Sequence, residues 1–439
     1  MATVYVQADD FSGAAEVGSC FAEHGFSAQV LLGVPDVGRT SSRPAPQVIV
    51  ADTHSRRLPA AAAEALVKNA FSSPEATGAP VLFKKIDSLW RGNVRAEASA
   101  LTSLGFHAVV AGALPQLQRS IVAGRALIAG TPLPQTNLWQ AEASPPPADV
   151  ASLLRPQNPD SVKTLDLANV RSRSLSTTLA GLLNYDQPQL VVADGETVQD
   201  LAHVVDALVE LHFHAGGRRV VLVGTGGAAT LLAIRLTKTA QPALEVPAAD
   251  PATIEPQASA RPVLAVVGSA STTAQSQLAQ LENRGFTVVR LLVHGGATDA
   301  DGPQLTLASA TLKAGNHVAV TVSEAQIVPA KAPSIVKALS QFAAEATKAT
   351  PADLILTGGE TAREVLNTIG RTSMVPLTAV QHGAVLGRAD DGTLVGTKPG
   401  SFGDDLALVQ LYDAILRYRP PNPHASLIPT KLPTNLEQQ

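Results

Sequence analysis

The feature that most constrains this sequence is the alternation of short apolar runs with helical stretches. Val4–Val6, Val48–Val50 and Val81–Phe83 are each followed by a polar turn and then by a stretch that reads as a helix. Short, continuously apolar strands are typical of a parallel sheet covered by helices on both faces. The sequence therefore predicts an α/β fold with mainly parallel sheets.

A second series of strands and helices starts after a stretch that is rich in Pro, Ala and Gln and has no periodicity. Because 439 residues exceed one ordinary domain, two α/β domains are the natural expectation. We predict a first domain over residues 1–240, a linker over 241–262 and a second domain over 263–439. The prediction includes an active site in the cleft between the domains.

The composition limits the kinds of binding partner and the cellular compartment that are expected for this protein. The net charge of −4 argues against nucleic acid or an anionic membrane as a general partner. The one cysteine, Cys20, excludes an intramolecular disulfide and suits a reducing compartment. The start MATVYVQADD is unlike a signal peptide, and no apolar run is long enough to span a bilayer. We expect a soluble, cytoplasmic protein.

Polar residues follow the predicted strands of the first domain where each strand ends. Asp9, Asp52, Asp87 and Asp194 each come shortly after such a strand, and Lys or Arg residues lie close to two of them. Ligands bind at the carboxyl ends of strands in an open parallel sheet. Carboxylates accept hydrogen bonds from hydroxyls and arginine clamps a carboxylate, so this mixture suits a polyhydroxy acid. Each Asp taken alone would more simply cap a helix.

Glycine-containing turns mark the second domain. Gly268–Thr273 and Gly358–Thr361 each follow a strand and open a helix, and Lys398–Gly403 adds a cation to a third turn. Backbone N–H groups at helix starts bind phosphates, so these turns predict a nucleotide site, although each is also compatible with an ordinary strand-to-helix turn. No P-loop motif is present. The glycine turn Gly224–Ala229 is interpreted as a tight turn and packing.

Taken in order, these motifs resemble those of the four-carbon acid sugar kinase family over nearly the whole chain. The matching segments are Ala8–Ala14, Asp52–Arg56, Lys85–Gly92, Gly268–Ser271, Gly358–Thr361 and Lys398–Gly403. The sequence departs from the family pattern at Ile86, Trp90, Gly112 and Pro399. The resemblance implies an ATP-dependent kinase that phosphorylates the terminal hydroxyl of a tetronate or 3-oxo-tetronate, while the departures leave a longer or branched sugar acid open.

The resemblance also implies roles for individual residues. Either Asp10 or Asp87 would be the catalytic base. The substrate-binding residues would be Asp9, Ser12, Asp52, Arg56, Lys85, Ser88, Arg91, Gly92 and Arg119, with Lys85, Arg91 and Arg119 holding the carboxylate. ATP would be bound by Ser269, Ser271, Gly358, Gly359, Glu360, Thr361, Lys398, Gly400, Ser401 and Gly403. Mg²⁺ would bridge the phosphates, with Glu360 as a candidate ligand.

Two alternatives from other classes stay open. A two-lobed protein that binds a sugar acid without catalysis would have the same architecture. A nicotinamide-dependent oxidoreductase would use the Gly224–Ala229 turn, but that turn lies too late in the chain for the first strand–helix unit. A homodimer is compatible with the sequence, which does not determine the oligomeric state.

Overall fold

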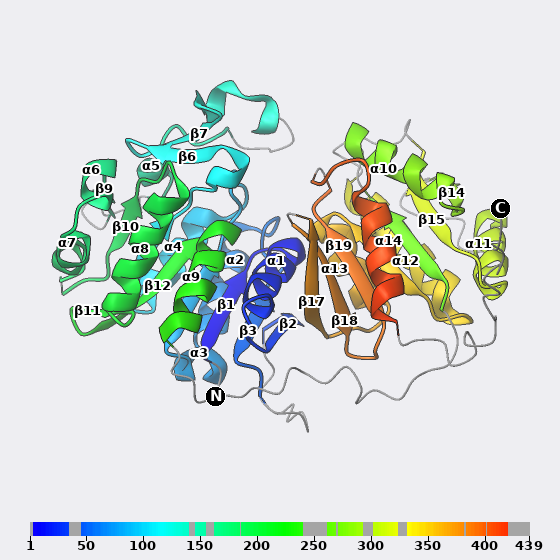
Figure 1. The fold of residues 1–439 in the computed structure, drawn as a ribbon, viewed down its shortest axis with the longest axis horizontal. Coiled ribbons are helices and arrows are strands. Elements are labelled where there is room, and N and C mark those ends of the chain that lie inside the picture. The colour runs from blue at the N-terminus through cyan, green and yellow to red at the C-terminus, as the bar shows by residue number, and fades with distance from the viewer. Residues whose placement is uncertain are drawn as a thin grey trace, which may run out of the picture.

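The computed structural model describes residues 3–34, 45–139, 145–154, 162–184, 186–239, 261–268, 271–292, 302–323, 332–381, 383–400 and 402–419. The described residues form two groups of strands and helices that lie side by side (Figure 1). The first half ends at residue 239 and the second begins at 261. No helix in these ranges is long and apolar enough to cross a bilayer.

The first half alternates strands and helices as predicted. Its strands in the main sheet are β1 (Val4–Ala8), β2 (Ala28–Leu32), β3 (Val48–Asp52), β4 (Val81–Lys85), β5 (His107–Ala111), β9 (Val162–Leu165), β10 (Leu190–Ala193), β11 (His214–Ala215) and β12 (Arg218–Gly224). Its helices are α1 (Phe11–Ala22), α2 (Ala60–Phe71), α3 (Pro74–Gly78), α4 (Val94–Ser103), α5 (Val150–Leu154), α6 (Leu167–Val170), α7 (Leu175–Leu182), α8 (Val198–Glu210) and α9 (Gly226–Thr239).

The second half continues the sheet. Its strands are β13 (Val263–Val267), β14 (Thr287–Leu291), β15 (Val318–Val322), β16 (Asp353–Thr357), β17 (Ser373–Gln381), β18 (Ala384–Ala389) and β19 (Leu394–Lys398). Its helices are α10 (Thr272–Asn283), α11 (Pro303–Lys313), α12 (Ala332–Lys348), α13 (Gly359–Thr368) and α14 (Ala407–Tyr418).

Buried apolar strands form the centre of the molecule. Every residue of β1, β3, β4 and β5 is buried, as expected for parallel strands with helices on both faces. The pairs among β1, β3, β4, β12, β5 and β10 are all parallel, and so are those among β13, β14, β15, β16 and β19. The prediction of an α/β fold with mainly parallel strands is confirmed.

The two halves share one 16-stranded sheet, a feature that the sequence did not reveal. β17 pairs antiparallel with β2, with Ser373 opposite Leu31 and Met374 opposite Val30. The Leu32 N–H donates to the Thr372 carbonyl at 2.8 Å. β2 and β17 escaped detection because polar residues and a proline interrupt their apolar pattern. The join places α1 beside the second half (Figure 1).

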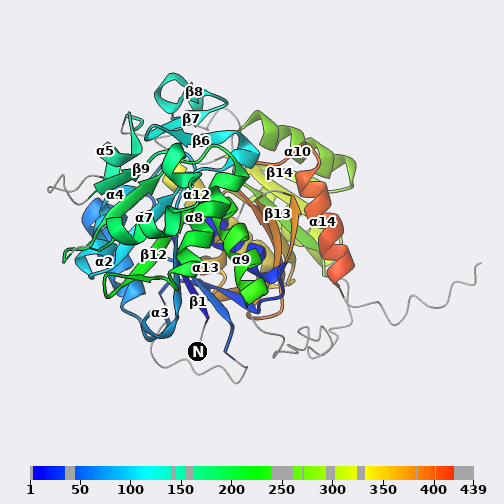
Figure 2. The same cartoon turned by 60° about the vertical axis from the view of Figure 1, so that its left-hand side comes forward.

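A small three-stranded sheet stands apart from the main one. It contains β6 (Arg119–Val122), β7 (Arg125–Ile128) and β8 (Thr131–Pro132), and the 3₁₀ helix η1 (Pro115–Leu117) leads into it from β5. In both views this sheet lies at the top, above the first-half strands, and α10 lies at the top of the second half (Figures 1 and 2). Arg119 is the first residue of β6, so this sheet brings a predicted site residue over the strand ends.

Candidate active site

The start of α1 places two acidic side chains at the end of β1. α1 begins at Phe11 because Asp10 adopts an extended conformation and its carboxylate accepts from the Gly13 N–H at 2.9 Å. Arg56 joins this pair: its Nε lies 2.8 Å from Asp9 Oδ2 and its Nη1 lies 2.9 Å from Asp10 Oδ2. The ends of β1 and β3 therefore meet in a shared ion pair. Asp10 caps α1 and also takes part in this ion pair through Arg56.

The surroundings shift the pKa values of Asp9 and Asp10 in opposite directions. Burial alone would raise the pKa of Asp9, but the neighbouring Arg56 and Lys84 hold it below its usual value. Burial raises the pKa of Asp10, and the attraction of Arg56 offsets only part of this increase. Asp10 is thus the member of the pair that more readily takes up a proton.

The turn after β4 binds its own aspartate tightly. Asp87 accepts from Arg91 Nε and Nη2, both at 2.8 Å, and from the backbone N–H groups of Leu89 and Arg91. Burial would raise the pKa of Asp87, but the paired Arg91 holds it well below its ordinary range. Gly92, with φ +88°, closes the turn where a Cβ would come within 3.0 Å of the Arg56 side chain. Arg91 and Gly92 therefore shape this turn in addition to any role in binding.

The two lysines of β4 have different acidic partners. Lys84 Nζ lies 2.8 Å from Glu97 Oε2, with each side chain 1% exposed. Lys85 Nζ lies 3.1 Å from Glu16 Oε2, and this carboxylate offsets the burial so that the pKa of Lys85 stays above its usual value. Glu16 and Glu97 were not predicted as site residues. Glu16 could have been found from its position one turn after Ser12 on α1, whereas Glu97 lies within a helix with no local signal.

The ends of the second-half strands form a compact turn region. The Gly268 N–H donates to Thr357 Oγ1 at 3.1 Å, and the Gly358 N–H donates to the Lys398 carbonyl at 2.9 Å. A Cβ at Gly268 would come within 2.2 Å of Thr361 Oγ1, so only glycine fits there. Lys398 is fully buried, and its Nζ donates to the Pro399 and Gly400 carbonyls at 2.8 and 3.1 Å. Predicted nucleotide-site residues from separate segments thus lie together.

The remaining predicted nucleotide residues differ in position. Ser271 caps α10 by accepting from the Ala274 N–H, and its hydroxyl donates to the Gly400 carbonyl at 3.5 Å. Gly403 has φ +82°, and a Cβ there would come within 2.6 Å of the Ala407 Cβ, so this glycine is required by packing at the start of α14. Ser269 and Ser401 lie outside the described residues.

The two groups of strand ends face each other across the junction of the halves. A Cβ at Gly359, the first residue of α13, would come within 2.7 Å of Asp10 Oδ2 and 3.1 Å of Ser12 Oγ. Ser12 Oγ is buried and has no hydrogen-bond partner among the described residues. Glu360 pairs with Arg57 of the first half. The predicted acid-sugar residues and the predicted nucleotide residues therefore meet at α1 and α13.

A buried ion pair also joins the halves. Arg363 Nη1 of α13 lies 2.8 Å from Asp52 Oδ2, which is fully buried at the end of β3. The sequence did not predict Arg363 because the pairing spans more than 300 positions. The pair commits Asp52 to the contact between the halves, so its predicted role in binding substrate hydroxyls would have to coexist with this contact.

The stability of the folded protein is expected to depend on pH through Asp52. Burial raises the pKa of Asp52 to about 7 from an ordinary value of 3.8, against the pull of Arg363. Since the folded state then holds the proton more tightly than the unfolded state, the stabilising contribution of Asp52 is fully present below pH 4 and is lost as pH rises through 7. We expect thermal unfolding measured from pH 5 to pH 8 to show this loss, and Asp52→Asn to remove it. The exposed variant Asp186→Asn should follow the wild type, and an unchanged profile in Asp52→Asn would contradict the assignment.

A small cavity lies along α1 between the halves. Its volume is about 170 Å³, and its lining includes Glu16, Ser19, Gln116, Gly226, Gln381 and Gly383. Ser19 Oγ is buried and has no hydrogen-bond partner among the described residues. Gly226 and Gly227 belong to the glycine turn that the sequence predicts to serve packing, and a Cβ at Gly226 would come within 2.2 Å of Glu16 Oε1. The turn therefore packs as predicted and also lines the cavity.

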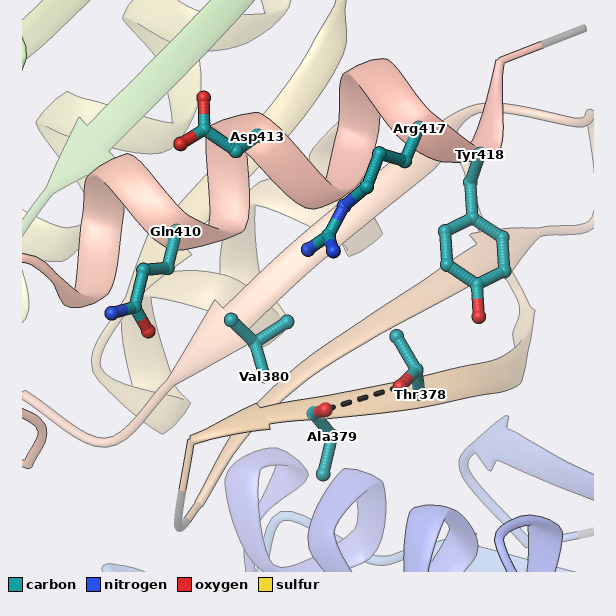
Figure 3. A pocket seen from close by; sticks show the side chains of 7 residues that line it. All are labelled: Thr378, Ala379, Val380, Gln410, Asp413, Arg417 and Tyr418. Carbon is teal, nitrogen blue, oxygen red and sulfur yellow. Dashed lines mark hydrogen bonds between the residues drawn. The ribbon is translucent and has the colours of Figure 1, made fainter.

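A larger open groove lies elsewhere and contains none of the predicted residues. Its volume is about 760 Å³, and β17 and α14 form its walls (Figure 3). Its lining residues are Thr378, Ala379, Val380, Gln410, Asp413, Arg417 and Tyr418. The side chains mix apolar and polar groups without a buried acid or an unpartnered buried polar atom, so the groove lacks the features expected for phosphoryl transfer.

A protein cage for a metal ion is absent from the part of the chain that the structure describes. No group of three or more His, Cys, Asp or Glu side chains there is arranged to hold a metal. Glu360, the candidate magnesium ligand, is paired with Arg57. These residues fit a Mg²⁺ ion that arrives on the phosphates of a nucleotide and keeps much of its water, rather than one bound by the protein alone.

Comparison with known proteins identifies both halves. A sugar-binding N-terminal domain matches residues 4–232, and a nucleotide-binding C-terminal domain matches residues 264–408. A D-threonate kinase from Cupriavidus necator is 33% identical over 431 residues, which cover 94% of this chain and 98% of that protein. A D-erythronate kinase from Heliobacterium modesticaldum is 25% identical, covering 95% and 98% of the two chains. A 3-oxo-tetronate kinase from Methylobacterium radiotolerans is 27% identical, covering 90% and 95%.

The fold has also been seen in crystals. A protein from Salmonella typhimurium LT2 superposes with a TM-score of 0.73 at 19% identity, covering 93% of this chain and 98% of that one. This likeness concerns the fold alone. The domain matches and the full-length similarity to kinases of acid sugars confirm the resemblance found in the motifs and the prediction of a kinase for a small acid sugar: the chain belongs to the four-carbon acid sugar kinase family.

Proposed function

We propose that this protein transfers the γ-phosphoryl group of ATP to the terminal hydroxyl of a four-carbon acid sugar, with D-threonate as the first candidate. The observation that carries the proposal is the contact between Gly359 and Asp10, because it brings the predicted nucleotide half onto the acidic residues of the predicted sugar half. The 33% identity to a D-threonate kinase over nearly the full length supports the choice of substrate. D-Erythronate and a 3-oxo-tetronate are the next candidates.

Asp10 is the better candidate for the base. Asp87 is held by the bidentate Arg91 and two backbone N–H groups, which leaves it little capacity to accept a proton. Asp10 has a raised pKa and lies against the start of α13. In the proposed reaction the bond from the γ-phosphorus to the ADP oxygen breaks, and a bond to the sugar hydroxyl oxygen forms. The hydroxyl proton would pass to the Asp10 carboxylate, and a Mg²⁺ ion held on the phosphates would supply charge neutralisation.

The other first-half residues would bind and orient the acid sugar. Asp9 and Ser12 would contact its hydroxyls beside Asp10. Arg56 and Arg91, whose side chains are 19% and 30% exposed, are the guanidiniums that a substrate carboxylate could reach. Arginine suits this task because its planar group binds a carboxylate through two hydrogen bonds. The predicted domain boundaries, the cytoplasmic location and a homodimer stay predictions.

The test is ADP release measured in a coupled assay with Mg-ATP and a panel of D-threonate, D-erythronate, 3-oxo-tetronates and longer acid sugars. Strong turnover on one four-carbon acid would establish the proposal and name the substrate. Turnover only on a longer acid would keep the kinase and replace the substrate. ATP-dependent stabilisation without turnover on any of these acids would keep the kinase and move the substrate outside the panel, and silence without ATP binding would contradict the proposal.

Lys398 is expected to govern ATP binding. Its ammonium group is buried among carbonyl groups, and burial lowers its pKa to about 8. Phosphates brought near this group would favour its charged form, so ATP binding should take up a proton and weaken as pH rises above 8. Lys398→Met should weaken ATP binding by about 10- to 100-fold, since a charged hydrogen bond contributes about 1.5–3 kcal/mol.

Thermal shift titrations with ATP at pH 7 and pH 9 would check this expectation. The exposed Lys313→Met is a matched control that should bind ATP like the wild type. Equal ATP affinity in Lys398→Met and the wild type would show that Lys398 only braces the turn between β19 and α14.

A further inference from the structure

Nearly every cation around the junction of the halves is paired with a carboxylate. The pairs are Arg56 with Asp9 and Asp10, Arg91 with Asp87, Lys84 with Glu97, Lys85 with Glu16, Arg57 with Glu360 and Arg363 with Asp52. Arg119 differs, as the buried Lys398 also does, because no carboxylate of the described residues lies within ion-pair distance of its guanidinium. Its charge is therefore available to an anion that enters the junction.

Arg119 contacts the substrate turn of the first half and the nucleotide turn of the second. Its Nη1 donates to Ser88 Oγ, next to Asp87. Its Cζ lies over the ring of Phe402, 5.8 Å from the ring centroid, in the geometry of a cation–π contact. Phe402 follows the Lys398–Gly400 turn. The guanidinium thus spans the gap across which a phosphoryl group would pass between the substrates.

A rigid support holds Arg119 in this place. Ile121, two residues along β6, exchanges two backbone hydrogen bonds with Gly195 at 2.8 and 2.9 Å. Beneath it the indole of Trp90 fills the space above Gly112, where a Cβ would come within 2.3 Å of the ring. Trp90 is buried and adopts φ +65°, a backbone conformation that bulky residues rarely take. The same residue therefore shapes the Asp87–Arg91 turn and supports the strand that carries Arg119.

We propose that Arg119 acts on the phosphoryl group in transfer and does not clamp the carboxylate of the acid sugar. This inference rests on the proposed kinase function. As the bond to the ADP oxygen breaks and the bond to the sugar hydroxyl oxygen forms, negative charge spreads over the oxygens of the moving group. A fixed guanidinium that needs no reorganisation stabilises this charge in the transition state more than in the ground state. Arg119 is then a catalytic residue, and the carboxylate is left to Arg56 and Arg91.

Steady-state kinetics of Arg119→Ala separates the two roles. Action on the moving group predicts that kcat falls by about 100-fold or more, with both KM values within about threefold of the wild type. Arg119→Lys should recover part of kcat because it restores the charge without the planar fork. The exposed Arg125→Ala, on the neighbouring strand β7, is the matched control and should keep full activity.

A large rise in the KM for the acid sugar with unchanged kcat would overturn the proposal in favour of a carboxylate clamp, and wild-type kinetics would also overturn it. A second readout covers variants that fail to turn over. ADP, Mg²⁺ and aluminium fluoride, which mimic the moving phosphoryl group, should stabilise the wild type beyond ADP alone, and Arg119→Ala should lose only this additional stabilisation. Inactivity of the wild type on every acid sugar would count against the proposed function itself, while this second readout would still decide the role of Arg119.

Discussion

Asp10→Asn is expected to lower the kcat of the acid sugar kinase reaction by about 10³-fold while changing both KM values little. The substitution removes the group that takes the hydroxyl proton and keeps the shape of the side chain. It also keeps the helix cap, because asparagine caps a helix as well as aspartate does, so α1 should still begin at Phe11. Arg56 would retain its two contacts with Asp9.

The pH profile distinguishes a base from a binding residue. Since burial raises the pKa of Asp10, the wild type should lose kcat/KM on the acid side as this carboxylate becomes protonated. Asp10→Asn should lose that acid limb together with most of the rate. Asp166→Asn, which makes the same change at the exposed cap of α6, is the matched control and should keep wild-type activity. An acid limb that persists in Asp10→Asn would assign the base to another group.

Glu97→Leu is expected to lower the free energy of unfolding by about 3–5 kcal/mol, the usual effect of removing one partner from a buried ion pair. Lys84 would be left charged in a site where its side chain is 1% exposed, and the Lys85 carbonyl, 2.8 Å from its Nζ, would still accept from it. Lys84→Met together with Glu97→Leu should recover most of this loss, because two apolar side chains need no compensating charge.

Thermal and urea unfolding of the three proteins would measure these differences. Glu64→Leu is the control, because Glu64 pairs with Lys68 on the surface of α2 and such pairs contribute about 0–1 kcal/mol. If Glu97→Leu were no more destabilising than Glu64→Leu, water would reach Lys84 and the burial of the pair would be disproved. Normal stability of the double variant combined with lost activity would show that the pair supports the catalytic turn.

The sequence predicted the strands that are buried on both faces and failed at the strands that join the halves. β13 begins and ends where expected because its five residues are all apolar. Gln29 interrupts β2, and Ser373, Pro376, Thr378 and Gln381 interrupt β17, so neither strand shows the continuous apolar run that identifies a buried strand.

The sequence likewise predicted part of the site and missed another part. Asp9, Asp10, Arg56, Asp87 and Arg91 converge as expected because the carboxyl ends of neighbouring parallel strands lie at one edge of a sheet. The partners of these residues could not be predicted, since Arg363 and Glu16 reach the cluster only through the packing of α13 and α1. Motifs indicate which residues take part in the chemistry. The ion-pair partners of those residues depend on how the helices pack.

The pairing of β2 with β17 has a consequence for how the chain can be divided. If the polypeptide were cut between residues 239 and 261 and the fragments separated, each would keep its own buried strands and expose one newly unpaired edge, β2 or β17, to water. An unpaired strand edge can pair with any available strand. Here the Asp52–Arg363 ion pair and the packing of Pro376 against Gly18 favour the pairing of β2 with β17 over other pairings. Two separately expressed fragments should therefore reassemble as a heterodimer. The covalent connection raises the effective concentration of the two halves, while their contacts determine which strands pair.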